Sequence, residues 1–412
     1  MAPRRLLILD DDPGVGQTIE LVARTAGLET HFTSSPGQFF AWLDKWQPDH
    51  IAVDLVMPEM DGVEVLAQLA QRQCQARIIV TSGVDGRVLD AAGRSASERG
   101  LHIVGMLPKP FMPSTLRRMF APEFPEQPAA PSVLRDTAAS ARHSSPAGVL
   151  GVTPTRKRFL VTPSDIRSGL ANQQFYAQYQ PKISCVNGAL VGFEALMRWE
   201  HPNYGPVPPD LFIGCAENSG LIDDLTRRMF DLSFHWFGQH FGHSAVRLSI
   251  NISARSRLDD GFIEDIGRRC AQCGIAPGQL IFELTETSAM EDPVASLDLL
   301  TRIRMKGMHL SIDDLGTGFS SLLQLVRLPF SELKVDKSFV MTAATSSESR
   351  QVVQAIVGLG RSLGIQSTAE GVEDEDTLRF LRDIGCNFAQ GFHIARPLSA
   401  QAAAGWSWTA TP

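Results

Sequence analysis

Short apolar runs, each about as long as one buried strand, alternate along this chain with longer segments of helical periodicity. Parallel strands need a helix-length connection between them, so this alternation favours an α/β fold built on parallel strands. Eight strands with intervening helices predict a closed (β/α)₈, TIM-like barrel in the second part of the chain. Four runs precede residue 120, at residues 6–9, 51–53, 78–80 and 101–107, and eight follow residue 160, at residues 175–179, 190–196, 246–250, 280–284, 309–312, 332–335, 365–369 and 388–392.

Residues 121–160 interrupt the alternation. They hold six of the 25 prolines among many alanines and serines, and they show no sustained apolar period. Such a composition is typical of a linker. We therefore expect an N-terminal domain over residues 1–120, a linker over 121–160 and a second domain over 161–412.

Composition narrows the class of protein. The net charge of -7 gives no electrostatic basis for binding a phosphate backbone, so we expect no DNA partner. Apolar runs are too short to cross a bilayer or to form a signal peptide, which predicts a cytoplasmic protein without membrane contact. The six cysteines are scattered, and the CxxC pair Cys270 and Cys273 lacks the further ligands that zinc needs.

Ionisable residues follow the apolar runs of the N-terminal domain. Asp10 and Asp11 follow the first run, Asp54 follows the run at 51–53, and Lys109 follows the last. In a parallel sheet these positions meet at one edge. Three carboxylates there would repel one another without a divalent cation such as Mg²⁺, and one could attack a phosphoryl donor. The alternative is that each acid only caps a helix or forms a turn.

The segments that contain these residues, LILDDDP, VDLVMPEMDG, IIVTSG and LPKPF, resemble the response-regulator receiver family over about the first 120 residues. The resemblance implies a doubly wound (βα)₅ domain that a sensor histidine kinase phosphorylates. One position departs from the family, because Met106 stands where an aromatic switch residue is usual. By resemblance the site consists of the phosphorylated Asp54, the Mg²⁺ ligands Asp10 and Asp11, the phosphoryl-contacting Thr81 and the counter-charge Lys109.

Polar residues also stand at the C-terminal ends of the second set of runs, where a (β/α)₈ barrel has its catalytic face. Five carboxylates in one mouth would raise one another's pKa values unless metals neutralised them, and an all-oxygen set favours Mg²⁺ or Mn²⁺. The adjacent Asp313 and Asp314 could bridge two metals if the strand breaks at Asp314, near Gly316 and Gly318. For any single residue the alternative is a cap or a salt bridge. The residues are Glu194, Asn251, Glu283, Asp313, Asp314, Lys334, Glu370 and Gln390.

The segments YQPKIS, FEALMRWEHP, SINIS, FELTET, IDDLGTGFSSL, LKVDKSFV, TAEGVE and AQGFHIARPL resemble the EAL-domain cyclic di-GMP phosphodiesterases over about residues 163–400. The resemblance implies a first metal on Glu194, Asn251, Glu283 and Asp313, and a second on Asp313, Asp314 and Glu370. Either Lys334 or Glu370 would act on the attacking water. The implied substrate contacts are Gln180, Leu196, Arg198 and Gln390. Glu286 would hold the loop after Asp314, in which Leu315 replaces the usual phenylalanine.

Three functions can be compared: an active phosphodiesterase, a barrel that binds cyclic di-GMP without cleaving it, and a regulator with a DNA- or protein-binding output. The first is favoured because every implied ligand position carries a suitable oxygen. We therefore expect a two-component response regulator that hydrolyses cyclic di-GMP to linear pGpG under phosphorylation control. It would use two Mg²⁺ or Mn²⁺ ions in the barrel and Mg²⁺ in the receiver. Its expected partners are cyclic di-GMP, a sensor histidine kinase and further copies of itself in a dimer or higher oligomer.

Overall fold

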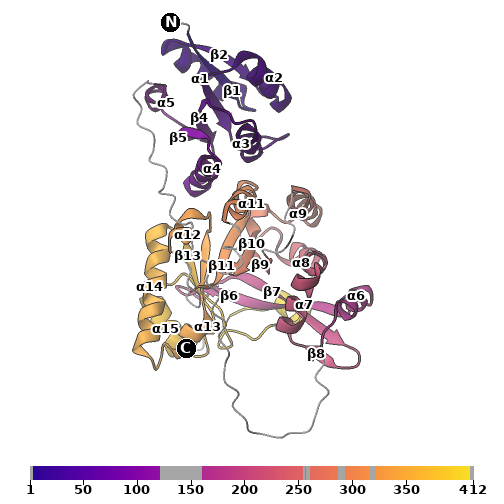
Figure 1. Ribbon diagram of the computed structural model, residues 1–412. Helices are drawn as coiled ribbons and strands as arrows, with labels where there is room; N and C mark the ends of the chain where they lie inside the picture. Colours follow the sequence, from indigo (N-terminus) through magenta and orange to yellow (C-terminus); the bar gives the residue numbers. More distant parts are fainter. Residues whose placement is uncertain are drawn as a thin grey trace, which may run out of the picture.

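The computed structural model describes residues 3–120, 160–253, 256, 260–285, 293–315 and 322–408. Within them the chain forms two units, an N-terminal open sheet and a C-terminal barrel (Figure 1). Residues 121–159 of the predicted linker lie outside the described ranges. No helix in the described part of the chain is both long and apolar enough to cross a membrane.

The N-terminal unit is a five-stranded parallel sheet in the order β2-β1-β3-β4-β5. Helices cover the sheet, and apolar clusters fill its two faces. This arrangement confirms the predicted doubly wound α/β fold. The strands are β1 (Arg4–Leu9), β2 (Leu28–Thr33), β3 (His50–Asp54), β4 (Arg77–Ser82) and β5 (His102–Pro108), and the helices are α1 (Pro13–Thr25), α2 (Pro36–Trp46), α3 (Gly62–Gln71), α4 (Gly86–Glu98) and α5 (Pro113–Met119).

The predicted apolar runs at 6–9, 51–53 and 78–80 fall within β1, β3 and β4, and the run at 101–107 begins one residue before β5, whereas no run was predicted at β2. Strand β2 has the sequence LETHFT, and only its first and last residues are buried. It is an edge strand that pairs with β1 alone, so it does not need the continuous apolar run of a central parallel strand. The apolar pattern of its residues was therefore too weak to predict a strand.

The C-terminal unit is a closed eight-stranded barrel with one additional strand. Its order is β6-β14-β13-β12-β11-β10-β9-β7-β8, and the pairing of β6 with β7 closes the barrel. An apolar cluster lies between the strands and the surrounding helices. The strands are β6 (Phe175–Ser184), β7 (Leu190–His201), β8 (Gly205–Val207), β9 (Arg247–Asn251), β10 (Leu280–Thr285), β11 (His309–Leu315), β12 (Glu332–Val335), β13 (Gln366–Ala369) and β14 (Phe388–Ala389).

The barrel differs from the expected all-parallel form in one strand. Strand β6 runs antiparallel to both β7 and β14. Only five residues separate β6 from β7, and a connection of that length permits a hairpin but no crossover. The predicted eight-stranded barrel is thus confirmed with this exception, and β14 is limited to two residues of the run expected at 388–392.

Helices surround the barrel, and α14 packs against β12 and β13 on one side (Figure 1). Helix α11 lies between the barrel and α4 of the N-terminal unit, so the two units are in contact (Figure 1). The helices are α6 (Pro163–Ala171), α7 (Pro209–Ser219), α8 (Ile222–Phe241), α9 (Asp260–Cys273), α11 (Pro293–Met305), α12 (Leu322–Arg327), α13 (Lys337–Thr342), α14 (Ser347–Leu363), α15 (Glu375–Asp383) and α16 (Ala400–Ala404), with a short 3₁₀ turn, η1 (Pro277–Gln279).

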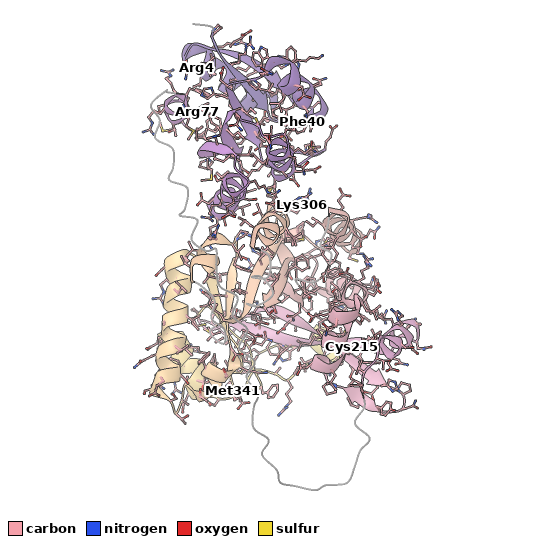
Figure 2. All side chains as sticks on the ribbon, viewed as in Figure 1. Arg4, Phe40, Arg77, Cys215, Lys306 and Met341 are labelled. Atoms are coloured by element: carbon pink, nitrogen blue, oxygen red, sulfur yellow. The ribbon has the colours of Figure 1, made fainter. Side chains whose placement is uncertain are left out.

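Side chains from both units fill the junction between α4 and α11, close to the labelled Lys306 (Figure 2). Asp298 of α11 accepts hydrogen bonds from Ser95 of α4 and from Arg99, the residue after α4. An ion pair also joins Arg327, the last residue of α12, to Glu98 of α4. Polar contacts thus accompany the packing of the two helices.

Candidate functional site

The acidic residues predicted in the N-terminal unit meet at the C-terminal edge of its sheet. Carboxylate oxygens of Asp10, Asp11 and Asp54 lie within 4.8 Å of one another. The Lys109 ammonium lies 2.9 Å from Asp10 Oδ2 and 3.1 Å from Asp54 Oδ2. The capping role that was the alternative for these acids belongs to Asp12, whose side chain accepts from the first turn of α1.

Burial sets the electrostatics of this edge. It raises the pKa of Asp54 to about 6, against the opposing effect of Lys109, and it also raises the pKa of Asp10. Asp54 Oδ1 is buried without a hydrogen-bond partner, although a buried carboxylate oxygen needs a cation, a donor or water. The residues present therefore fit a divalent cation among Asp10, Asp11 and Asp54.

Two further residues of the predicted receiver site lie beside this cluster. The Thr81 hydroxyl is buried at the end of β4 and donates to the Val53 carbonyl oxygen at 3.4 Å. Met106 lies on β5 with its sulfur against α4, because a Cβ added at Gly93 would be 2.3 Å from Met106 Sδ. The thioether thus fills the space between the sheet and α4.

In the barrel, the predicted carboxylates converge on one buried ammonium group, that of Lys334. Lys334 Nζ lies 2.8 Å from Glu283 Oε2, 3.3 Å from Asp313 Oδ2 and 2.5 Å from Glu370 Oε1. Glu194 Oε2 is 3.6 Å from the same nitrogen. Four of these side chains come from different strands and Glu370 directly follows a fifth, so the closed barrel brings together residues that are up to 176 positions apart.

Amide side chains hold Glu194 from the other side. Asn251 Nδ2 donates to Glu194 Oε1 at 3.0 Å, and Gln390 Nε2 donates to Glu194 Oε2 at 2.6 Å. Gln390 also donates to Gln180 Oε1 at 3.1 Å, and Gln180 in turn donates to the Ala395 carbonyl oxygen. The hairpin pairs Gln180 with Glu194 across β6 and β7, which explains how a residue of the antiparallel strand reaches the site.

The strand does not end at Asp314 as the sequence predicts, because β11 continues to Leu315, but its backbone is irregular there. Asp314 has a left-handed backbone with φ 57, and the register between β11 and β12 shifts between Ile312 and Leu315. Its backbone N–H donates to Asp313 Oδ1 at 2.9 Å. The irregularity ends the alternation of side chains, so the two adjacent aspartates need not face opposite ways. Gly316, Gly318 and Glu286 lie outside the described residues.

Burial and crowding shift the barrel carboxyl groups in different directions. Burial raises the pKa of Glu283 well above its usual value and that of Glu370 to about 8. Although burial opposes it, Lys334 and the amide hydrogen bonds lower the pKa of Glu194. Burial and neighbouring Asp313 raise the pKa of Asp314 to about 6. The prediction that the clustered carboxylates raise one another's pKa values thus holds for part of the set.

A mostly apolar cavity of about 300 Å³ opens beside these carboxylates. Leu196 and Arg198, two of the predicted substrate contacts, line it together with Asn251. The Arg198 guanidinium is held by Gln178, whose Oε1 accepts from Arg198 Nε at 2.9 Å. The cavity is thus continuous with the carboxylate site through Asn251.

Sequence reasoning missed several residues that shape this region. Gln178 holds Arg198, and Glu217 accepts from Ser253 Oγ at 2.8 Å at the wall of the cavity. Asp336 caps α13 and helps to raise the pKa of Asp314. Asp336 is part of LKVDKSFV, so that motif contained a signal for it, whereas Gln178 directly precedes YQPKIS and lies outside it. Glu217 stands in none of the quoted segments.

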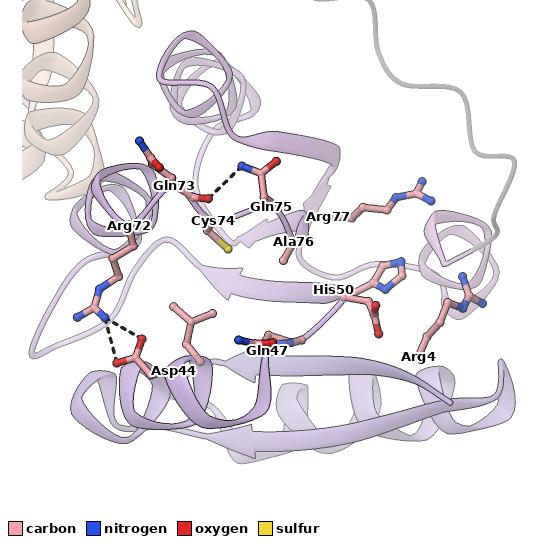
Figure 3. Close-up of a pocket in the computed structure, with 13 residues that line it drawn as sticks. Arg4, Asp44, Gln47, His50, Arg72, Gln73, Cys74, Gln75, Ala76 and Arg77 are labelled. Carbon is pink, nitrogen blue, oxygen red and sulfur yellow. Dashed lines mark hydrogen bonds and ion pairs between the residues drawn. The ribbon is translucent and has the colours of Figure 1, made fainter. Parts of the chain in front are cut away.

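A second cavity, of about 840 Å³, lies at the opposite ends of the N-terminal strands from Asp54 (Figure 3). Arg4, His50 and Arg77, from the starts of β1, β3 and β4, lie around it. Neither ring nitrogen of His50 has a hydrogen-bond partner. Burial, with Arg4 and Arg77 nearby, lowers the pKa of His50 to about 4. None of the predicted site residues lines this cavity.

Comparison with known families decides the class of both units. The EAL domain family matches residues 164–397, and the response regulator receiver domain family matches residues 6–121. The chain belongs to the EAL domain family and carries a receiver domain before the EAL barrel. This confirms the resemblance that the sequence motifs indicated.

Similar proteins include curated relatives and solved structures. The chain is 32% identical to the cyclic di-GMP phosphodiesterase RocR of Pseudomonas aeruginosa over 352 residues, which are 84% of each protein. It is 40% identical to the bifunctional diguanylate cyclase/cyclic di-GMP phosphodiesterase MucR of the same species, over 58% of this chain but only 35% of MucR. The structure of the PaMucR phosphodiesterase in complex with c-di-GMP matches with a TM-score of 0.55 at 40% identity, over 58% of this chain and 98% of that one.

Proposed function

We propose that the barrel is a cyclic-guanylate-specific phosphodiesterase that hydrolyses cyclic di-GMP to linear pGpG, and that phosphorylation of Asp54 in the receiver controls it. The observation that carries the proposal is the convergence of four carboxylates on Lys334 at the mouth of an EAL barrel. The relative that matches along most of both chains bears the name cyclic di-GMP phosphodiesterase, which supports the same substrate.

The donor set of the barrel fits Mg²⁺ or Mn²⁺. Glu283 Oε1 is buried without a hydrogen-bond partner, so the cluster has an oxygen whose charge is not yet compensated. Divalent ions bound here would lower the pKa of a coordinated water and stabilise charge on the phosphodiester. One ion would be held by Glu194, Asn251, Glu283 and Asp313, and the other by Asp313, Asp314 and Glu370.

The proton of the attacking water needs an acceptor, for which Glu370 and Lys334 are the two candidates. Although burial opposes it, the surrounding carboxylates hold the pKa of Lys334 well above its usual value, so this side chain is an ammonium ion at neutral pH. An ammonium ion can orient water but cannot accept a proton. We therefore assign an orienting, charge-balancing role to Lys334. We assign the base to Glu370, because bound divalent cations would lower its raised pKa and leave a carboxylate that can accept the proton.

The cavity next to the carboxylates supports recognition of a nucleotide. Its apolar wall, which includes Leu196, would contact a guanine base, and Arg198 could donate to a phosphate or to the acceptor edge of guanine. Gln178 fixes the guanidinium of Arg198, which reduces the entropy lost when substrate binds. Gln390 would hold Glu194, and Gln180 would position Gln390 by accepting its hydrogen bond, rather than either contacting the reacting phosphate directly.

The purified chain provides the test. Incubated with cyclic di-GMP and Mg²⁺ or Mn²⁺, it should form pGpG, measured by chromatography, and excess chelator should stop the reaction. Ca²⁺ should support little turnover, because it tolerates looser geometry than an in-line displacement needs. Hydrolysis that persists in chelator would contradict the metal assignment, and tight binding without product in Mg²⁺ and Mn²⁺ would show a barrel that binds but does not cleave.

A further inference from the structure

Arg87, in the first turn of α4, connects the receiver to the ends of two barrel helices. Its guanidinium donates to the carbonyl oxygens of Leu325 and Leu328, at the end of α12, at 3.3 and 3.1 Å. It also donates to the carbonyl oxygen of Leu363, the last residue of α14, at 3.1 Å. The final carbonyls of a helix lack partners within the helix and carry partial negative charge. One receiver side chain therefore caps two barrel helices.

Two ion pairs join α11 to loops of the receiver. Arg302 Nε donates to Asp61 Oδ2 at 2.7 Å, and Arg304 Nη2 lies 3.3 Å from Asp85 Oδ2. Arg304 also donates through Nη1 to the carbonyl oxygen of Met308, directly before β11, at 2.9 Å. Arg304 thus contacts the receiver and the start of a barrel strand at the same time.

The receiver partners of these arginines follow its two site strands. Asp61 lies in the connection that follows Asp54, and its other carboxylate oxygen caps α3 by accepting from the Glu64 N–H at 2.9 Å. Asp85 caps α4 and comes four residues after Thr81. On the barrel side, α11 leads into β11, which carries the adjacent aspartates of the candidate active site just before its last residue.

Apolar side chains interdigitate at the same junction. Ala91 of α4 is buried and belongs to the apolar cluster of the barrel, whereas Met305 of α11 packs against the cluster of the receiver. The opposite face of α4 contacts Met106 at Gly93. Helix α4 is therefore in contact with β5 of the receiver on one side and with the barrel on the other.

We propose that this junction, formed by Arg87, Arg302 and Arg304 with their partners, is a phosphorylation-sensitive latch that holds the receiver on the barrel until Asp54 is phosphorylated. The latch deepens the proposed function, on which it rests, because it specifies how the receiver would reach the active site. The two loops that provide Asp61 and Asp85 are those that follow Asp54 and Thr81, so a change at either site residue reaches an ion pair within seven residues of chain.

The direction of the change follows from the present contacts of the receiver site. Thr81 donates to the Val53 carbonyl, and Lys109 is held between Asp10 and Asp54. A phosphoryl group on Asp54 supplies strong acceptor oxygens to both side chains and draws Thr81 away from Val53. Because Leu55 N–H donates to the Thr81 carbonyl at 3.0 Å, both receiver loops move with Thr81. This movement takes Asp61 and Asp85 away from Arg302 and Arg304. The two ion pairs then break, and α4 separates from α11.

Hydrogen exchange of the full chain, followed by mass spectrometry, measures the latch without relying on turnover. Beryllium fluoride with Mg²⁺ serves as the probe, because it forms a phosphoryl analogue on an aspartate. We expect it to raise exchange over residues 86–98 and 297–305 by at least severalfold, while α15 does not change. Arg87→Gln should raise exchange over 297–305 without the probe. Arg379→Gln, which removes an exposed arginine of α15, is the matched control and should not raise it.

Each outcome decides the proposal. Raised exchange with the probe, and in Arg87→Gln without it, supports the latch, and Arg304→Gln provides a second variant if the first does not fold. Unchanged or reduced exchange of α4 and α11 with the probe would overturn it. If the helices respond but cyclic di-GMP is not hydrolysed, the proposed function fails and the latch remains. If hydrolysis is normal but the helices do not respond, the latch alone fails.

Discussion

The receiver and the barrel each place one lysine among carboxylates, but the two lysines differ in burial and in number of partners. Lys109 contacts Asp10 and Asp54 and is 19% exposed, whereas Lys334 contacts four carboxylates and is 1% exposed. A partly exposed ammonium group can exchange partners at small cost when a phosphoryl group arrives. A buried one cannot leave without uncovering several unpaired charges. The comparison suggests a reversible switch in the receiver and a permanent charge-balanced centre in the barrel.

The largest difference should appear when each lysine is replaced by methionine. Lys334→Met removes the cation at the centre of the barrel site, so we expect hydrolysis to fall by about 10³-fold, the scale for losing an electrostatic group of an active site. Lys109→Met should change hydrolysis far less and should act on the response to a phosphoryl donor. Steady-state rates with a circular dichroism check of folding provide the measurement. Similar losses in both variants would contradict the contrast between the two sites.

Replacing the proposed metal ligands of the barrel should cause the next largest loss of turnover. Glu194→Ala or Asp313→Ala removes a carboxylate from the proposed metal site without removing a core apolar group, so we expect about 10²-fold lower turnover with the fold retained. Glu375→Gln, which changes an exposed glutamate of α15, is the matched control. If either alanine variant keeps most of its activity across a metal titration, the acids only cap or pair at strand ends.

Phosphorylation of the receiver site should change the rate at which the barrel hydrolyses cyclic di-GMP. A small phosphoryl donor with Mg²⁺ should modify Asp54 and change the turnover of the barrel, and Asp54→Asn should abolish this response. We expect a smaller change than in the metal-ligand variants, because an allosteric coupling is typically about 5- to 150-fold. The comparison needs wild type and Asp54→Asn, each with and without donor. Equal rates in all four samples would mean that the receiver serves location or assembly.

The smallest expected effect is on the pH dependence of thermal stability. It concerns His50, which lies with Arg4 and Arg77 at the edge of the receiver sheet opposite Asp54. Because the pKa of His50 is lowered to about 4, the unfolded chain binds a proton that the folded chain does not. This contribution to stability is complete above pH 6.5 and declines as the pH falls toward 4. His50→Gln should therefore reduce the fall in Tm over that range by a few degrees, measured by thermal unfolding, relative to the exposed control His243→Gln. Equal pH dependence of Tm in the two variants would contradict a role for His50.

Much of both sites could be predicted because parallel strands place their C-terminal residues at one edge. Asp54 directly follows an apolar run, and Glu283 and Lys334 stand one residue before the ends of theirs, so their convergence needed no knowledge of packing. Contacts between distant segments could not be predicted in this way. The hydrogen bond from Arg198 to Gln178 depends on the antiparallel hairpin, whose direction differs from that of the other strands.

The junction between the two units was also not predictable from local patterns. Arg87 and Arg304 look like ordinary helix-surface residues in the sequence, since periodicity shows which side of a helix is polar and not what covers it. Strand β2 was missed for a related reason, because its exposed edge position relaxes the apolar pattern. Sequence therefore indicates what lies within each unit better than what lies between them.

The central claim, that the barrel uses water to open a phosphodiester of cyclic di-GMP, can be tested most directly by isotope labelling. The reaction is run in H₂¹⁸O with Mg²⁺ or Mn²⁺, and the product is analysed by mass spectrometry. The account predicts linear pGpG that carries one ¹⁸O atom on its terminal phosphate, formed by wild type and about 10²-fold more slowly by Asp313→Ala. Unchanged cyclic di-GMP with both metals, or a product without ¹⁸O, would contradict it.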